Sequence, residues 1–544
     1  MNTKLTLQTE LSKVLQCSPA ERARTIIDSP YTKQILKQLS SQETYMIIKE
    51  SWGTDSQILL PYIPPETIGH FIDMDCWEKD NLSVEGLFEW LWEIYNASVD
   101  TLQDALEHMD LDLVILLFQS YLEVVQVVPT DEHIPDLLNA GYESFDDIYY
   151  FRFTEDDEKT QLLKDMLSIL FTHHQDIYYG IMEGVLWEIK SFMEESLFER
   201  RTLRLMEMGF PPPDEAVSIY QHIRPHSLLK TGLQKEKTPL IDEEKSFLPS
   251  LYMEHFSQNK GIVVQAIADS PEGTRDRLVY EMIYLANKII MADFRPLNEL
   301  DELRKSMDKA SSITSLGLAI AMRENKSSAQ SILENVNAET LFSLGYNMVY
   351  EQQKRLKLLL RELESSMIPE SLNEYVEGLL KKRPLYKDTE FSTIEQLEQV
   401  TWHIDRIEAL VNIAAELAWD RQIDKLKETN TGTNLDMENI VLTSLAVNFI
   451  EKQSYFRPVS LAELLDFLEQ TTLLDSTGAR VFLPEVRDDL IGYLSTFAST
   501  REESLIEALA DLLVSRFDSE LSGISTLTDL DVRFITCFVV RMQE

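Results

Sequence analysis

The densest set of potential metal ligands in the sequence is His173, His174, Asp176 and Glu183. Residues three, four or seven apart share one face of a helix, so His173 with Asp176, and Asp176 with Glu183, could present ligands on the same side. No His-Glu-x-x-His motif accompanies them, and a di-metal helical bundle needs Glu-x-x-His on two helices. A solvated helix with one partly buried histidine is the favoured interpretation, and His173, Asp176 and Glu183 are kept as candidate metal ligands.

The sequence lacks the common signatures of nucleophilic and phosphate chemistry. It contains no Gly-x-Ser-x-Gly, no Gly-x-x-x-x-Gly-Lys and no Gly-x-Gly-x-x-Gly. Ser227 and Lys230 have Ser-x-x-Lys spacing, but patterns this short occur by chance. We therefore predict no catalytic residues and no cofactor. An enzyme would have to assemble its site from distant helices.

Four charged residues are embedded in otherwise apolar stretches: Lys49, Glu50, Asp73 and Asp75. A charge at the edge of a core needs a partner. We predict that Lys49 pairs with Asp73 or Asp75 and so fixes the register of two neighbouring helices. The alternative is a cation site formed by Glu50, Asp73 and Asp75.

These charges lie in residues 39–77, where one pattern that starts a helix occurs twice. Ser40 precedes Glu43 at the spacing of a capping box, in which both side chains satisfy free backbone N–H groups. Pro64 and Pro65 precede Glu66, which suits the first turn of a helix. Serine and glutamate recur at the capping-box spacing further along the chain, at Ser392 with Glu395 and at Ser460 with Glu463.

The periodicity predicts an all-α protein with little or no strand. Long alternating β-branched runs are missing, and 17 glycines are few for a β protein. We expect one long helix over residues 177–204 and a short hairpin over residues 473–482. Between residues 226 and 250 the sequence turns polar and loses its period. This predicts a stacked-helix lobe over residues 1–224, a linker over 225–248 and a helical lobe over 249–544.

Composition restricts the compartment and the partners. The formal charge of -42, from 92 acids and 50 bases, argues against nucleic acid as a partner. Residues 101–160 hold 15 acids, which form either a solubilising face or a region that attracts a basic protein surface or divalent cations. The three cysteines are far apart, no secretory signal is recognisable, and the longest apolar stretches are too short to span a membrane. We expect a cytoplasmic protein without membrane insertion.

Several phrases resemble a known family: ETYMIIKE, FIDMDCW, LMEMGFPPPDEAVSIY, LVYEMIYLANKIIMAD and LFSLGYNMVY. They are similar to large, acidic, all-helical bacterial proteins of deltaproteobacterial type, defined only as a domain of unknown function. The resemblance implies a helical fold over nearly the whole chain and brings no activity, cofactor or site. The helix start at residues 63–66 is also similar to those of superhelical domains in a magnesium transporter and in the flagellar motor switch, a likeness that covers about the first 130 residues.

Stacked helices expose long surfaces and grooves, and no enzyme motif competes with this feature. The function predicted from the sequence is therefore a cytosolic scaffold or adaptor that binds another protein. A basic surface on that partner is one feature that the acidic chain could recognise. The alternative is a regulatory or enzymatic helical protein that uses acidic side chains to hold a divalent cation.

Overall fold

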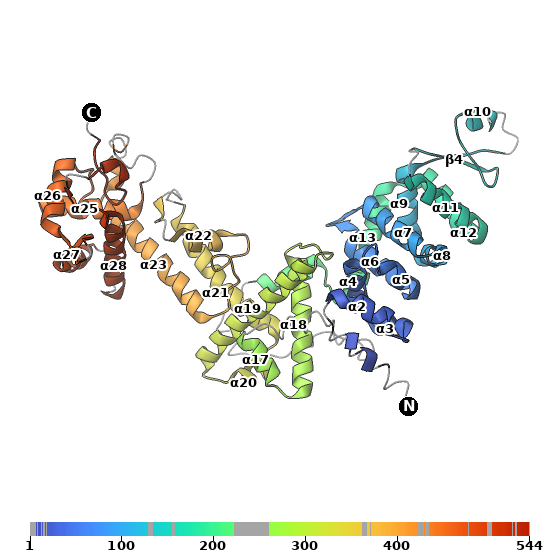
Figure 1. Cartoon of the computed structure of the whole chain (residues 1–544), viewed down its shortest axis with the longest axis horizontal. Coiled ribbons are helices and arrows are strands. Elements are labelled where there is room, and N and C mark those ends of the chain that lie inside the picture. Colours follow the sequence, from blue (N-terminus) through green and yellow to red (C-terminus); the bar gives the residue numbers. More distant parts are fainter. Residues whose placement is uncertain are drawn as a thin grey trace. The chain divides into compact units, whose positions relative to one another are not determined.

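The computed structural model describes residues 7, 9–11, 13–14, 17, 19–128, 134–154, 158–221, 261–361, 367–369, 372–422, 426, 429, 435–476, 478–497, 503–524, 526–527 and 530–542. The chain forms two compact units, Met1–Leu344 and Gly345–Glu544. Helices make up most of both, so the predicted all-α class is confirmed (Figure 1). The predicted linker at 225–248 lies outside the described residues, and helices before and after it belong to the first unit. The linker therefore stays a prediction.

The first half of the first unit is a stack in which alternate helices pack on one another: α2 on α4, α4 on α6, α6 on α8, and α5 on α7. Its described elements are α2 (Pro19–Ile27), α3 (Thr32–Gln38), α4 (Ser41–Glu50), α5 (Ser56–Leu59), η1 (Leu60–Tyr62), α6 (Pro65–Asp75), β1 (Trp77–Glu78), β2 (Asn81–Leu82), α7 (Val84–Ala97), α8 (Val99–His108) and α9 (Leu111–Tyr121).

Local sequence signals explain where these helices begin. The Ser40 hydroxyl accepts a hydrogen bond from the backbone N–H of Glu43 at 3.2 Å and caps α4. Pro65 is the first residue of α6, where its missing N–H costs nothing. Large apolar side chains then fill the core between the helices, with Tyr45, Phe71 and Trp90 each at most 1% exposed.

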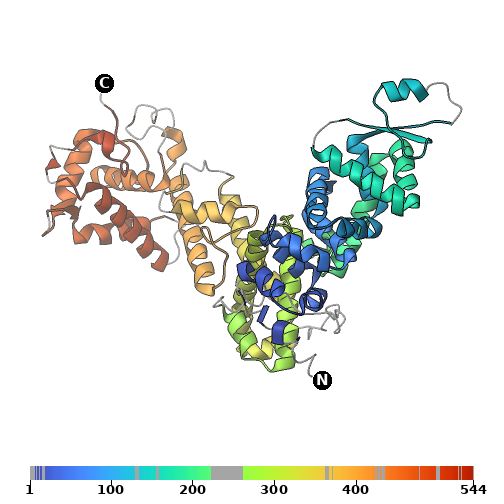
Figure 2. The same cartoon turned by 45° about the vertical axis from the view of Figure 1, so that its right-hand side comes forward.

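A β-hairpin follows the stack, and the sequence had not indicated it. The next elements are β3 (Leu122–Gln126), α10 (Ile134–Asn139), β4 (Tyr149–Phe153), α11 (Glu158–His173), α12 (Gln175–Trp187), α13 (Lys190–Glu207), α14 (Pro213–Ala216) and η2 (Val217–Tyr220). Strands β3 and β4 pair antiparallel, with Leu122 opposite Phe153 and Gln126 opposite Tyr149. The hairpin and α10, drawn in cyan in Figure 2, lie at one end of the stack.

Two glycines bring α12 close to α9. A Cβ atom at Gly184 would lie 2.4 Å from the nearest side-chain carbon of Ile115, and one at Gly180 would lie 3.0 Å from Leu111. These glycines stand one turn apart on the same face of α12, so two helices can approach there more closely than larger residues would allow. The stack thereby continues from α9 into α12.

The rest of the first unit packs against the same core. Its helices are α17 (Ile262–Ala268), α18 (Glu272–Ala292), α19 (Leu300–Asn325), α20 (Ala329–Asn335) and the start of α21 (Ala338–Leu359). Ile290, Leu297 and Leu303 belong to the hydrophobic cluster of the stack. A buried pair, Lys309 Nζ with Asp293 Oδ2 at 2.7 Å, joins α19 to the end of α18.

The second unit is also helical. Beyond the rest of α21 it contains α22 (Asn373–Leu380), α23 (Ile394–Glu416), η5 (Trp419–Gln422), α25 (Met437–Glu451), α26 (Leu461–Thr471), β5 (Thr472–Leu474), β6 (Arg480–Phe482), α27 (Pro484–Leu494), α28 (Glu503–Leu521) and η7 (Val532–Phe534). The predicted capping box of Ser460 and Glu463 is confirmed, as is the hairpin, formed here by β5 and β6. At α23 the cap is Thr393 with Gln396, one residue beyond the predicted pair.

Candidate functional site

The predicted partner of Lys49 lies at the end of α6. Lys49 Nζ donates to Asp75 Oδ2 at 2.9 Å, and the same carboxylate accepts from Tyr45 Oη at 3.0 Å and from Trp90 Nε1 at 2.7 Å. Burial and the nearby Asp75 charge raise the pKa of Tyr45, so its hydroxyl keeps its proton. The cluster joins α4, α6 and α7 through one carboxylate that is 9% exposed.

We expect Lys49→Met and Asp75→Asn each to destabilise the first unit by about 1–3 kcal/mol, since each leaves a half-buried charge unpaired. The double variant should lose less than the sum of the two. Hydrogen exchange of α4 and α6 peptides measures both effects on the full chain. Lys49→Met combined with Asp73→Asn serves as the control, because these two residues have different partners. Strict additivity of the Lys49→Met and Asp75→Asn effects would contradict the pairing.

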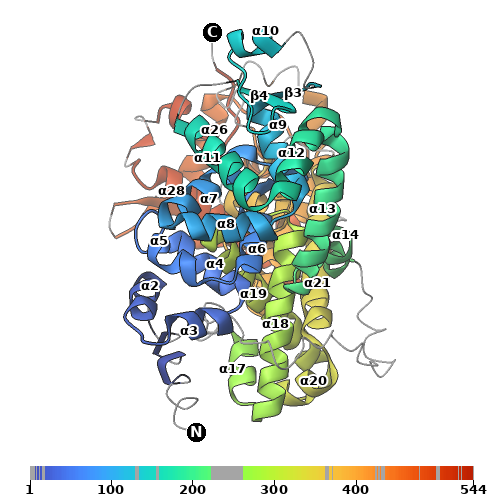
Figure 3. The same ribbon diagram turned by 90° about the vertical axis from the view of Figure 1, so that its right-hand side faces the viewer.

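Asp73 belongs to a second group of charges. Arg204 on α13 donates to both of its carboxylate oxygens, from Nε at 2.5 Å and from Nη2 at 2.9 Å. Arg204 also donates to Asp110 at 2.8 Å, and Arg200 donates to Asp110 at 3.0 Å and to Asp112. The hydrogen bonds to Asp73 raise the pKa of Arg204 above the ordinary value of an arginine. This ladder, Asp73–Arg204–Asp110–Arg200–Asp112, fastens α13 to α6 and to the start of α9. Figure 3 shows the backbone of these three helices.

The candidate cation sites do not form in the described residues. Asp73 and Asp75 face different bases, and across the described ranges no group of three or more His, Cys, Asp or Glu side chains could hold a metal ion. His173 is the last residue of α11 and Asp176 lies in the first turn of α12, so the helical spacing expected between them does not apply. His173, Asp176 and Glu183 are exposed.

The prediction of one long helix over residues 177–204 is wrong, because the segment forms two helices with an exposed apolar junction. The chain leaves helical geometry at Glu188 (ψ 140°) and Ile189 (ψ 118°), so α12 and α13 are separate helices. Trp187, Ile189 and Phe192, at this junction, are 72%, 56% and 66% exposed. Three large apolar side chains therefore point into solvent within one short segment.

Helix α13 carries apolar residues on two opposite faces. Its inner face buries Met193, Leu197, Arg201 and Leu205, which follow one another at intervals of four residues. Its outer face presents Phe192, Leu203 and Met206, the last two 62% and 45% exposed. At 100° per residue these three share one side of the helix, which the inner packing directs away from the core. We call Trp187, Ile189, Phe192, Leu203 and Met206 the α12–α13 face.

Acidic side chains lie among and beside the residues of this face. Exposed glutamates interrupt its apolar residues, at positions 188, 195, 199 and 207. Lys190 in the same segment pairs with Glu194 at 3.8 Å, and Arg200 is engaged by Asp110 and Asp112. The face thus combines large apolar side chains with negative charges. The sequence analysis missed it because a second apolar stripe on a helix is interpreted as core.

A family model described as "Family of unknown function (DUF6178)" matches residues 1–541. The chain belongs to this family. The predicted membership in a helical family of unknown function is therefore confirmed, and the likeness to magnesium-transporter and flagellar-switch domains stays a prediction. Comparisons with curated proteins and with solved structures gave no match. The described part of this DUF6178 chain has no helix with the length and apolar character that a membrane span requires.

The second unit of this family member contains a histidine in an unusual setting. The ring of His403 on α23 lies 4.3 Å from that of Tyr375, and both of its nitrogens are buried without a hydrogen-bond partner among the described residues. Burial, followed by the charges of Arg406 and Lys387, lowers the pKa of His403 to about 4. It is therefore neutral in the folded protein at pH 5, where an exposed histidine would be charged.

We expect His403→Phe to reduce the acid sensitivity of the second unit. The folded-state pKa lies below the ordinary 6.5, so the unfolded chain binds more protons between these values and stability falls as the pH drops from about 6.5 to 4. After allowance for partial exposure, removing the imidazole should recover about 1 kcal/mol at pH 5. Hydrogen exchange of α23 at pH 7 and pH 5 measures this. An equal pH dependence in both proteins would contradict the assignment.

Proposed function

We propose that this chain is a helical scaffold that binds another protein through the α12–α13 face. The observation that carries the proposal is the exposure of Trp187, Ile189 and Phe192, at 72%, 56% and 66%, next to one another in the chain. Burying one large apolar side chain gains roughly 1.5–3 kcal/mol over leaving it in water. Exposed apolar patches with a polar border mark interaction sites, and tryptophan is enriched among the residues that dominate binding energies.

The glutamates of the face indicate the chemistry of the partner. Glu188, Glu195, Glu199 and Glu207 would repel an acidic surface, and the chain as a whole carries a formal charge of -42. Complementary potentials steer association and suppress wrong partners. The partner we propose is therefore a protein with an apolar patch flanked by lysine or arginine.

The scaffold role also accounts for the ladder beneath the face. Asp73, Asp110 and Asp112 hold the two arginines of α13, so the inner side of the helix is fixed by ion pairs as well as by apolar packing. A binding surface that is rigid before association loses less entropy when the partner arrives.

The double variant Trp187→Ser/Phe192→Ser tests this proposal. Tagged full-length protein is purified from its own host, the partner that co-purifies is identified, and its affinity for the purified variants is measured. We expect the double variant to bind at least about 10-fold more weakly, because two central aromatic contacts are lost. Ile58→Ser/Val99→Ser is the matched control, since these residues are each 50% exposed in the same unit and lie outside the face.

Equal binding by the face variant and the control would overturn the proposal. A second arm tests the glutamates: Glu195→Gln/Glu199→Gln should slow association and make it less sensitive to salt, with little change in the dissociation rate. An unchanged association rate would contradict a basic partner.

A further inference from the structure

The first unit contains a cavity of about 590 Å³ between the β1–β2 turn, α13 and the segment that joins α18 to α19. This volume lies within the range of about 300–1,000 Å³ typical of small-molecule sites. The lining is mostly apolar and includes Trp77, Phe198, Leu205, Phe210, Ile290 and Leu297. The α12–α13 face lies on the other side of α13, so the cavity is a separate feature.

A buried arginine lines this cavity. Arg201 is 8% exposed, its Nε donates to the backbone oxygen of Asp73 at 2.7 Å, and its guanidinium carbon lies 5.2 Å from the Trp77 ring centroid. The carboxylate of Asp73 is engaged by Arg204 on both oxygens. Within the described part of the chain, Nε is the only Arg201 nitrogen with a hydrogen-bond partner.

The charge of Arg201 persists despite its burial. Desolvation lowers the pKa of Arg201 to about 10, with the nearby Arg204 charge acting in the same direction and Asp73 opposing it. The group is therefore cationic at neutral pH. Its terminal nitrogens have no hydrogen-bond partner among the described residues and are not fully buried, so they are accessible from the cavity, where an anion would pair with them.

A second donor beside the arginine is also unsatisfied. Trp77 lines the same cavity, and its indole Nε1 is buried without a hydrogen-bond partner among the described residues. Because almost none of the surface of this nitrogen is accessible, a ligand in the cavity meets the indole ring and not its N–H group. Arg201, which packs against that ring, is the donor that defines a site for an oxygen anion.

We propose that this cavity binds an amphipathic monocarboxylate, whose carboxylate accepts hydrogen bonds from the terminal nitrogens of Arg201 and whose apolar body lies against Phe198, Leu205 and Phe210. Arginine presents two parallel N–H groups that match a carboxylate. The aromatic and aliphatic lining provides the surface for the rest of the molecule.

The other charges around the cavity favour a single negative charge. Glu78, Asp80 and Glu299 are exposed acids of the lining and would repel a polyanion such as a nucleotide. Arg295 also lines the cavity, but it is paired with Glu302 at 3.2 Å and lies 3.6 Å from Asp293. Lys79 and Arg201 are the other bases of the lining, and Lys79 is exposed to solvent. Arg201 is thus the buried base that faces the anion.

Calorimetric titration of the full-length protein with octanoate and with 3-phenylpropionate tests the proposal. We expect saturable binding at one site per chain. Octanamide keeps the apolar body without the charge, whereas acetate and inorganic phosphate keep a charge without the body, so each of these three should bind at least about 10-fold more weakly. No saturable binding of either carboxylate, or equal binding of octanamide or phosphate, would overturn the proposal.

Two variants link binding to the residues. Arg201→Met should weaken octanoate binding about 10- to 100-fold, as expected for a charge-assisted bidentate contact. Arg200→Met is the matched control, because Arg200 pairs with Asp110 and Asp112 and does not line the cavity. Thr202→Phe keeps Arg201 and fills part of the cavity, so it should also abolish binding. This variant tests the site even if Arg201→Met fails to fold. Wild-type affinity in either cavity variant would contradict the site.

Discussion

Replacement of Asp73 by asparagine is expected to lower the free energy of unfolding of the first unit by about 3–5 kcal/mol, because it leaves the partly buried Arg204 without its main counter-charge. The side chain of Asp73 is 1% exposed and that of Arg204 is 25% exposed. Asparagine preserves the shape of the carboxylate, so the change reports the loss of charge and of one acceptor. The remaining contact of Arg204 with Asp110 at 2.8 Å is shared with Arg200 and cannot replace a two-oxygen pairing.

Hydrogen exchange of α6 and α13 peptides in the full-length protein measures this loss. Asp80→Asn is the matched control, because Asp80 is exposed in the β1–β2 turn and its replacement should change stability by less than about 0.5 kcal/mol. Arg204→Met should be similarly destabilising, and the double variant should lose much less than the sum, since neither charge is then left alone. A loss below 1 kcal/mol for Asp73→Asn would show that the ladder adds little to stability.

Features set by neighbouring residues were predictable from the sequence. The caps at Ser40 and Ser460, the proline start of α6 and the β5–β6 hairpin each depend on a few consecutive side chains. The error of one residue at α23 arises because Ser392 and Thr393 both have a partner three residues later, and the backbone selected Thr393. Local chemistry identifies the cap, and packing chooses between adjacent candidates.

Features set by distant residues were not predictable. Asp73 and Arg204 are separated by 131 residues, and nothing local to Asp73 distinguishes its partner from that of Asp75. The strands β3 and β4 are joined through α10, so the turn signal of a short hairpin is missing, although the aromatic residues at 149–151 and 153 are typical of a strand. The break after Trp187 contains neither glycine nor proline, so no residue type marked it.

The two proposed binding regions also depend on residues that are distant in the sequence, so they were not predictable either. Phe192, Leu203 and Met206 look like core residues in the sequence, and only the packing of Met193, Leu197 and Leu205 on the opposite side of α13 shows that they face solvent. Arg201 lies between Arg200 and Arg204 in the sequence, and the three residues look equivalent there. In the structure Arg200 and Arg204 bind carboxylates, whereas the terminal nitrogens of Arg201 do not.

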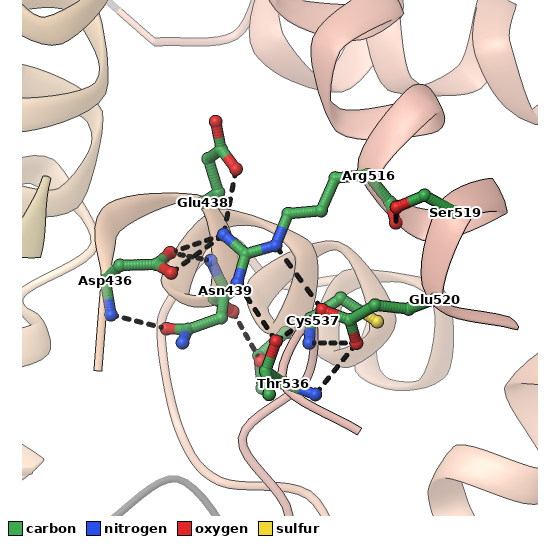
Figure 4. A network of polar contacts seen from close by, with 9 residues as sticks. Asp436, Glu438, Asn439, Arg516, Ser519, Glu520, Thr536 and Cys537 are labelled. Atoms are coloured by element: carbon green, nitrogen blue, oxygen red, sulfur yellow. Dashed lines mark hydrogen bonds and ion pairs between the residues drawn. The ribbon is translucent and has the colours of Figure 1, made fainter. Parts of the chain in front are cut away.

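Replacement of Arg516 by methionine is expected to have the corresponding effect in the second unit, a loss of about 3–5 kcal/mol. Arg516 on α28 contacts Asp436 and Glu438 at 2.8 Å each and lies 3.7 Å from Glu520 (Figure 4). Asp436 caps α25, and Glu520 accepts from the backbone N–H groups of Thr536 and Cys537. The guanidinium therefore holds together α25, α28 and the segment near the C-terminus.

The deficit of Arg516→Met should shrink as the pH falls from 7 to 5. Burial raises the pKa of Glu438, and Arg516 opposes this rise together with Arg406. Without Arg516 the folded-state pKa moves further above the ordinary value, so the folded protein takes up a proton that the unfolded chain does not bind, and acid stabilises the fold. Hydrogen exchange of α25 and α28 at both pH values measures this change.

Arg487→Met is the matched control, because Arg487 and Asp511 form an exposed pair worth about 1 kcal/mol or less. A loss equal to that of the control, or one that grows in acid, would contradict the role assigned to Arg516.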